Sequence, residues 1–255
     1  MILYRGPSLL DGKPIVAIAN GWASTRPNRK TGPAIQTYVF RSDVSPMEAA
    51  SSGEDSSVCG DCPLRPITSG VCYVEIGKGV RWTWEEYERG HYGDWNPEFL
   101  LRIMGWLVRI GTYGDPAAVP FEIWRDIASH AGNHTGYTHQ WRTCDQRFRS
   151  ICMASVDSER EGQQALAMGW RTFRLRRPDE SLASGEIVCP SSAEGLYRRQ
   201  CSECRACRGA GHGQSSVAIV VHGRPWKAAQ LGRLKNGQTD LQGLPSKKRP
   251  TLARM

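Results

Sequence analysis

The sequence lacks the two kinds of segment that direct a chain to or across a membrane. Its first residues, MILYRGPSLLDGKP, have neither the basic start nor the long apolar stretch of a secretory signal, and no run of about eighteen apolar residues occurs. We therefore expect a cytoplasmic protein with no membrane partner. With 40% hydrophobic and 23% charged residues, the 255-residue chain has the composition of one or two ordinary domains.

Acidic residues are almost missing from the end of the sequence. Residues 224–255 contain eight Lys or Arg and only one acidic residue, Asp240, so they carry +7 of the chain's net charge of +8. The segment also has three prolines and few apolar residues, which predicts a flexible tail. This tail is either a solvated end or an arm that contacts nucleic-acid phosphates without sequence preference. Nucleic acid is the partner that the second interpretation predicts.

Composition and pattern divide the chain into residues 1–50, 51–223 and the tail, 224–255. Two β-rich runs joined by a polar loop predict an N-terminal β-hairpin in the first region. In 51–223, short β-prone runs alternate with amphipathic segments, as in β–α units on a mostly parallel sheet. The expected fold class is α/β, with either a partial, TIM-like barrel or an open sheet, because the strands are too few for an eight-fold barrel. We expect helices over 83–90, 120–132 and 158–169, and strands over 107–115, 135–141, 151–157, 170–175, 186–192 and 216–223.

Two of the expected helices have the spacing of a capping box at their start. Thr83 and Ser158 are each followed three residues later by a glutamate. We therefore predict both as N-caps.

Polar side chains gather where the predicted strands end, which is where parallel α/β folds place their chemistry. Asp115, His139 and Asp157 are the candidate catalytic residues at these ends. Each has a structural alternative: Asp115 as a turn residue, Asp157 as a carboxylate at a helix N-terminus, and His139 as a buried histidine with satisfied hydrogen bonds.

Three arginines accompany the predicted strand 170–175. We expect Arg171, Arg174 and Arg176 to share one face, where they would bind a phosphate or carboxylate or else face water.

Nine cysteines in a reducing compartment indicate metal or redox chemistry rather than a disulfide framework. Cys59, Cys62 and Cys72 form an upstream trio, which needs either an open coordination position or a fourth ligand such as His91 or Cys144. An open position is typical of a catalytic site, and a fourth protein ligand of a structural one.

A second set of cysteines follows the pattern C-x11-C-x2-C-x2-C. Four thiolates hold a tetrahedral Zn²⁺ or a [4Fe–4S] cluster equally well, so the spacing predicts a metal without choosing between them. The two cysteines outside both sets, Cys144 and Cys152, have the character of small buried residues. The members of the second set are Cys189, Cys201, Cys204 and Cys207.

The succession CGDC…CYV, VRIGTYGDP, GYTHQW, MASVDS, GWRTFR and CPSS…CSECRAC resembles a cysteine-rich family of phage and prophage proteins related to the phage "gene product 88" proteins. The resemblance spans most of residues 5 to 223 and implies the cytoplasm of a bacterial host. The layout is similar to that of radical S-adenosylmethionine enzymes, although the spacing here is C-x2-C-x9-C where those enzymes have C-x3-C-x2-C.

This resemblance implies a [4Fe–4S] cluster on the upstream trio, which is followed by Tyr73. It also implies that the turn from Tyr113 to Pro116 binds the amino group of S-adenosylmethionine. The cofactor contacts expected on this basis are Tyr113, Gly114, Asp115 and Arg174. The second cysteine set would hold an auxiliary cluster or zinc.

Two other functions are compatible with the same residues. In the first, both cysteine sets bind zinc and the basic tail makes the chain a nucleic-acid-binding or host-interfering phage protein without catalysis. In the second, the chain is similar to enzymes that exchange guanine bases in nucleic acid, with Asp115 or Asp157 as a carboxylate nucleophile.

Overall fold

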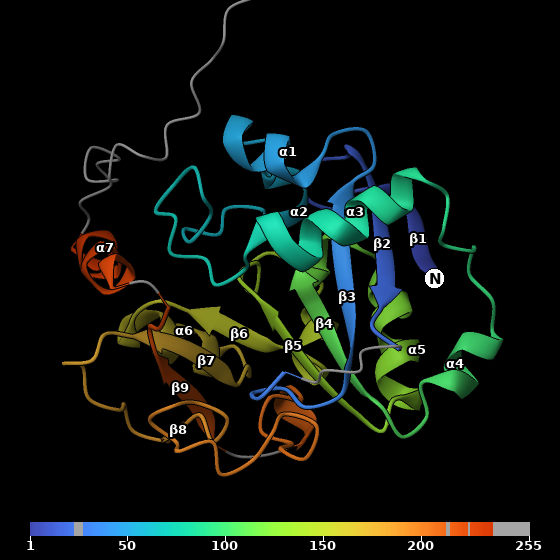
Figure 1. Ribbon diagram of the computed structural model, residues 1–255. Helices are drawn as coiled ribbons and strands as arrows, with labels where there is room; N and C mark the ends of the chain where they lie inside the picture. Colours follow the sequence, from blue (N-terminus) through green and yellow to red (C-terminus); the bar gives the residue numbers. More distant parts are fainter. Residues whose placement is uncertain (23–27, 213–214, 224, 237–255) are drawn as a thin grey trace, which may run out of the picture.

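The computed structural model describes residues 1–22, 28–212, 215–223 and 225–236, and the order of its elements is shown in Figure 1. Nine strands form one sheet in the order β1-β2-β3-β4-β5-β6-β7-β9-β8. The first three pair antiparallel, and the others are parallel to their neighbours. The strands are β1 (Ile2–Pro7), β2 (Pro14–Asn20), β3 (Ala34–Arg41), β4 (Leu107–Tyr113), β5 (Asn133–Thr138), β6 (Met153–Val156), β7 (Thr172–Arg176), β8 (Glu186–Val188) and β9 (Ser216–Val220).

The sheet confirms the expected α/β class and the N-terminal hairpin. From β3 to β7, each strand lies beside the one that follows it along the chain, as in a barrel. In an open doubly wound sheet, by contrast, the strand order reverses at a switch point. β1 and β8 remain as the two edges of the described sheet. The hairpin has one strand more than expected, because β1 pairs with the outer side of β2.

The helices connect these strands, and α1, α2 and α3 lie together over one end of the sheet, at the top of Figure 1. None of the helices in the described part of the chain is long and apolar enough to cross a membrane. The helices are α1 (Pro46–Ser52), α2 (Ser56–Cys59), α3 (Arg81–Glu88), α4 (Glu98–Arg102), α5 (Phe121–His130), α6 (Glu159–Ala167) and α7 (Trp226–Lys235). Shorter helical turns are η1 (Ile76–Val80), η2 (Pro116–Ala118), η3 (Gln146–Ser150) and η4 (Ala210–His212).

The helix starts follow the expected capping in one case and not in the other. Ser158 caps α6, since its Oγ accepts from the backbone N–H of Glu161. Thr83, in contrast, lies inside α3 and is fully buried, and its hydroxyl donates to the carbonyl of Gly79. The prediction of Thr83 as an N-cap is therefore wrong, because the chain is already helical through η1 before it reaches this residue.

The tail begins with a packed helix rather than a flexible segment. α7 buries Leu231 completely, Trp226 lies against Gly70, and the ammonium group of Lys227 donates to the carbonyl of Cys72 at 2.6 Å. The prediction of flexibility from residue 224 onward is thus wrong for α7, where one buried leucine and contacts with the cysteine loop outweigh the polar composition. Residues 237–255, including the basic cluster Lys247–Arg249, lie outside the described residues.

We expect two truncations to behave differently. A chain that ends at Asn236 should keep the melting temperature of the full chain. A chain that ends at Gly223 should melt about 3–12 °C lower, because burial of one leucine contributes about 1.5–3 kcal/mol and each kcal/mol is about 2–4 °C at this size. Differential scanning calorimetry of both forms measures this, and equal melting temperatures would show that α7 adds no stability.

Candidate functional site

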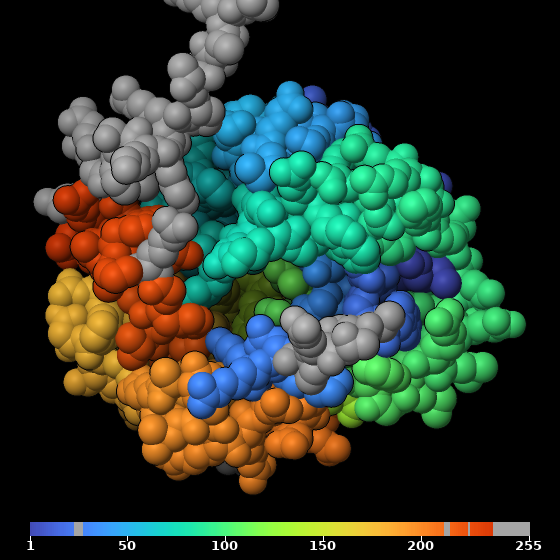
Figure 2. All heavy atoms as spheres, in the orientation of Figure 1, coloured from blue at the N-terminus to red at the C-terminus, as the bar shows by residue number. Residues whose placement is uncertain are grey.

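Five neighbouring strands, β4, β5, β6, β7 and β9, line one cavity of about 340 Å³. Alternate residues of a strand face it, as Thr135 and Tyr137 do on β5 and Phe173 and Leu175 on β7. Because adjacent strands present one face to the same cavity, the sheet curves around it. Figure 2 shows the hollow at the centre of the molecule, with the teal segment above it and the blue segment that precedes β3 below it. Its volume is near the lower end of small-molecule pockets, about 300–1,000 Å³.

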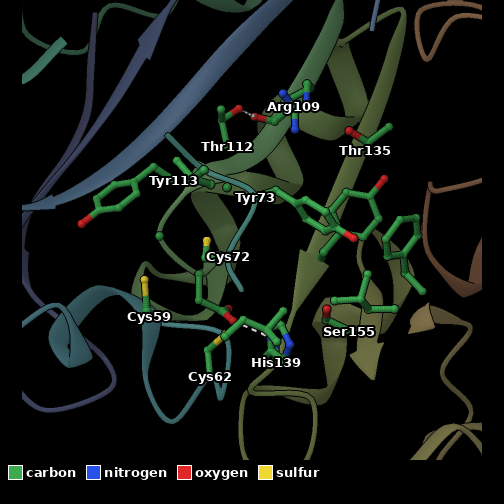
Figure 3. Close-up of a pocket in the computed structure, with 18 of the residues that line it drawn as sticks. Cys59, Cys62, Cys72, Tyr73, Arg109, Thr112, Tyr113, Thr135, His139 and Ser155 are labelled. Atoms are coloured by element: carbon green, nitrogen blue, oxygen red, sulfur yellow. Dashed lines mark hydrogen bonds between the residues drawn. The ribbon is translucent and has the colours of Figure 1, made fainter. Parts of the chain in front are cut away.

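The segment after α2 brings the upstream cysteines to one wall of this cavity. Cys59 ends α2, Cys62 follows in the next turn, and Cys72 comes after a ten-residue step along the chain. All three line the cavity, and Figure 3 shows them on the side of His139 and away from Arg109. The structure thus brings together the three thiols that the sequence singled out.

One arginine fixes the shape of this cysteine loop. Arg65 donates from Nε to Asp55 at 3.0 Å, from Nη1 to the carbonyl of Gly60 at 2.8 Å and from Nη2 to the carbonyl of Gly53 at 2.9 Å. Asp55 is almost fully buried, and this burial raises the pKa of its carboxyl group although Arg65 opposes the shift. The buried pair is a rigid support for the two cysteines on either side of Gly60.

The three cysteines of the trio are each partly buried. Burial raises the pKa of Cys59 well above its usual range, and the neighbouring Cys62 and Cys72 raise it further. Burial is also the largest cause of the raised pKa of Cys72. Buried thiols that disfavour each other's ionisation are stabilised as thiolates when a cation binds among them.

His139 and Asp157 form a polar pair beside the trio. The Nε2 of His139 lies 3.4 Å from Oδ2 of Asp157. Burial alone would lower the pKa of His139, but the sulfur of Cys62 and the carboxylate of Asp157 outweigh it and raise the pKa well above its usual value. His139 Nε2 and Asp157 Oδ1 are buried without a hydrogen-bond partner in the described part of the chain. His139 is therefore not the satisfied buried histidine of the structural alternative, and it lines the cavity whereas Asp157 stands behind it.

Asp115 connects strand ends to each other instead of presenting a free carboxylate. One of its oxygens accepts from Thr138 Oγ1 at 2.7 Å and from the N–H of Ala117 at 2.9 Å, and the other accepts from the N–H of His139 at 2.8 Å. It is buried, and burial raises its pKa despite these hydrogen bonds. The geometry fits the turn interpretation of Asp115 better than the catalytic one.

The neighbouring turn residues Tyr113 and Gly114 also line the cavity. Gly114 has φ +80°, and a Cβ there would lie 2.8 Å from Cβ of Val39, so only glycine fits. The hydroxyl of Tyr113 is buried with no hydrogen-bond partner among the described residues. The turn thus packs closely against β3, and the Tyr113 hydroxyl is left as an unsatisfied polar atom beside the cavity that the cysteine trio lines.

The second cysteine set surrounds a separate and much smaller cavity of about 20 Å³. Burial raises the pKa of Cys207 to about 12. The hydroxyl of Ser191 lies 3.6 Å from Sγ of Cys201. The small cavity is next to the large one, since Cys201 and Lys30 line both. All four members, Cys189, Cys201, Cys204 and Cys207, line the small cavity.

Two buried polar residues hold the loop of this second set. Asn133 donates to the carbonyls of Cys201 and Cys204 at 3.0 and 3.1 Å. Arg171 donates to the carbonyls of Gly209 and Ala206 at 2.9 and 2.8 Å, and also to that of Ser215. Arg171 therefore binds backbone of this chain and is not available for a ligand.

Arg174 lies outside the large cavity, contrary to the cofactor role expected for it. On β7 it points away from the face that carries Phe173 and Leu175, and its guanidinium donates to Glu186 at 2.7 and 2.6 Å. Arg176 shares its face and pairs with Glu194. The expectation that Arg171 shares this face is also wrong. Arg171 lies three residues before Arg174, and side chains alternate between the two faces along a strand, so an odd separation places them on opposite sides.

Neither candidate for a fourth ligand of the trio lies next to it. His91 is exposed and contacts Glu86 at 2.7 Å, and Cys144 lines neither cysteine cavity, so neither stands beside the trio as a fourth ligand. Cys152 is fully buried, as expected. Sequence reasoning missed Lys30, which lines the large cavity from a loop without any motif around it. It also did not single out Arg109, although this residue lies within VRIGTYGDP.

Within residues 1–22, 28–212, 215–223 and 225–236, no group of three or more His, Cys, Asp or Glu side chains is arranged so that it could hold a metal ion. All nine cysteines are free thiols. The sequence matches no family model, no curated protein and no solved structure.

Proposed function

We propose that this chain is an iron–sulfur enzyme of the radical S-adenosylmethionine type, of phage origin, that works in the bacterial cytoplasm. The observation that carries the proposal is the meeting of the cysteine trio, the Tyr113–Asp115 turn and His139 in one cavity at the carboxyl ends of parallel strands. In the resembling enzymes, the cysteines follow the first parallel strand and the acidic turn ends the second. Here the trio follows β3 and the turn ends β4.

The residues present fit such a cluster in their chemistry. Three partly buried thiols line one wall, and Tyr113, whose hydroxyl has no hydrogen-bond partner among the described residues, and His139 line the same cavity. The thiolates of a cubane cluster stand farther apart than those around a single ion, because the cluster lies between them. Cys59, Cys62 and Cys72 would hold three irons.

When bound, the cluster and S-adenosylmethionine would together supply one-electron chemistry that starts a radical reaction. The chain's own contribution is binding, orientation and exclusion of water. The Tyr113–Asp115 turn would face the cofactor through its backbone, since both oxygens of Asp115 are already engaged. Asp157 faces Nε2 of His139 and would hold a proton on that nitrogen, which fixes the orientation of the ring at the cavity wall.

The second cysteine set supports zinc rather than a second cluster. Its four thiols surround a cavity of about 20 Å³, which is room for about one water-sized particle. A single tetrahedral Zn²⁺ needs less room than a cubane, and the four thiols would have to close around it, since the described residues form no preassembled metal site. This set would then be a structural site that fixes the C-terminal loop.

Metal analysis of anaerobically purified protein tests the proposal. We expect about four irons, about four sulfides and about one zinc per chain, with a broad visible absorption that bleaches on reduction. Reduced protein should release methionine from S-adenosylmethionine. A colourless protein with two zinc ions and no iron would overturn the proposal and favour the zinc-stabilised binding protein.

A further inference from the structure

The large cavity has two chemically different ends. The cysteine trio and His139 stand at one end, and Arg109, Thr112 and Thr135 stand at the other, as Figure 3 shows. The second end is completed by Asn28 and Lys30 from the loop between β2 and β3. None of these residues takes part in the function proposed above.

The carboxylates that line the cavity in the described chain are both engaged elsewhere. Asp55 is paired with Arg65 at 2.8 Å. Asp115 accepts three hydrogen bonds around the strand ends. No carboxylate of the described residues lies within ion-pair distance of Lys30 or Arg109.

At the far end, neutral groups hold the side chain of Arg109, and Lys30 is held through the backbone of its loop. Arg109 donates to the amide oxygen of Gln36 at 3.0 Å, and the same oxygen accepts from Thr112 at 2.8 Å. The backbone of the Lys30 loop is fixed to the second cysteine set, because the carbonyls of Lys30 and Thr31 accept from the N–H groups of Cys201 and Ser202 at 3.0 Å each. Arg109 is paired in register with Thr135 of β5, and Thr135 lines both cavities together with Lys30, so the two cationic residues flank the same part of the cavity wall.

Burial is the largest cause that lowers the pKa of the Lys30 ammonium group, Cys189 and Cys201 oppose this shift, and repulsion by Arg109 adds to it. An oxyanion between them would remove this repulsion and accept charge-assisted hydrogen bonds from both. From this juxtaposition we propose that Lys30 and Arg109 form a subsite for the phosphate or carboxylate group of a small molecule that binds in the cavity. That this molecule is the enzyme's substrate rests on the proposed function, whereas the subsite does not.

A metal centre at the second cysteine set offers a rival explanation for one of the two cations. Its thiolates would place negative charge near Lys30, which interacts with Cys189 and Cys201. That explanation leaves Arg109 without a charged partner. The two explanations predict different results for the two variants.

The test is isothermal titration of the folded protein with inorganic phosphate and, separately, with acetate, at constant ionic strength. Arg109→Gln and Lys30→Gln should each weaken the tighter-binding anion about tenfold or more, because each removes a charge-assisted hydrogen bond. Arg29→Gln is the matched control, since Arg29 lies next to Lys30 but stacks on Tyr197 outside the cavity, 4.2 Å from the ring centre. Phosphate binding without acetate binding would identify a phosphate ligand, and the reverse a carboxylate.

Zinc and iron are measured in the same samples, and circular dichroism verifies folding, with Arg109→Lys as a substitute if Arg109→Gln does not fold. Equal anion affinity in all variants would overturn the subsite. Loss of zinc in Lys30→Gln with unchanged anion affinity would also overturn it, in favour of the thiolate explanation. Protein without iron whose anion affinity still depends on both cations would support the subsite while the proposed function fails.

Discussion

Replacing Cys62 by serine should remove about four iron atoms per chain and the visible absorption from anaerobically purified protein, and stop the release of methionine from S-adenosylmethionine. Serine keeps the size of the side chain but is not a thiolate at neutral pH, so a cluster with only three protein ligands loses one of them. The fold should survive, because Cys62 is half-exposed on a loop that Arg65 holds independently. Iron, sulfide and zinc are measured on the same preparation.

Two further serine variants make this experiment specific. Cys144→Ser is the matched control: it makes the same chemical change outside both cysteine cavities and should leave iron and zinc unchanged. Cys204→Ser should lose zinc and keep iron. If Cys204→Ser lost the iron and Cys62→Ser kept it, the cluster would belong to the second set and the assignment of the trio would be refuted.

The second large effect concerns Arg174. Arg174→Ala should lower the free energy of unfolding by about 3–5 kcal/mol, because it leaves the buried carboxylate of Glu186 without its partner. At about 2–4 °C per kcal/mol, the melting temperature should fall by roughly 10 °C. Iron content should not change, since Arg174 points away from the cavity. Thermal and urea unfolding followed by circular dichroism measure the loss.

The matched control for Arg174 is Arg177→Ala, which removes an exposed pair with Asp179 and should leave the melting temperature nearly unchanged. The double variant Arg174→Met/Glu186→Leu should recover much of the lost stability, because no buried charge is left alone. If Arg174→Ala kept normal stability but lost S-adenosylmethionine binding, the result would support the original prediction that Arg174 contacts the cofactor.

The pH dependence of this pair has a definite sign. Burial would raise the pKa of Glu186, but hydrogen bonds from Arg174 and from the N–H of Ala183 lower it below its ordinary value. Such a carboxylate stabilises the folded state above its unfolded pKa of about 4.3 and loses that contribution as the pH falls through the lower folded value. The stability difference between the natural chain and Arg174→Ala should therefore shrink below about pH 4.

Much of the fold was predictable because the signals were local. Pro120 before an amphipathic run and Ser158 in capping-box spacing set two helices near their observed starts. β1 was missed because its sequence, ILYRGP, ends in Gly-Pro, which is typical of a turn. The proline is tolerated because β1 is an edge strand. α7 was missed because its single fully buried leucine is a tertiary contact inside a polar segment.

The site divides in the same way. Short spacings revealed both cysteine sets, and strand ends revealed His139 and Asp157. Lys30 could not be found, because its position depends on a loop that meets the second cysteine set across the fold: Gln200 donates to the carbonyl of Arg29, 171 residues away in sequence. Arg174 was misassigned because the sequence shows only that the residue is positively charged. Its position on the outer face of β7 places its guanidinium against Glu186 rather than in the cavity.

The place of β9 between β7 and β8 has a consequence for biosynthesis. β8 leaves the ribosome before β9 does, yet in the described sheet β9 is its only partner. Until β9 emerges, β8 has no neighbouring strand in the described sheet, and the outer edge of β7 stays open. When β9 emerges, it pairs with β7 on one side and with β8 on the other, which completes this part of the sheet. A nascent chain stalled before Ser216 would expose the unpaired edge of β7, which is prone to aggregation.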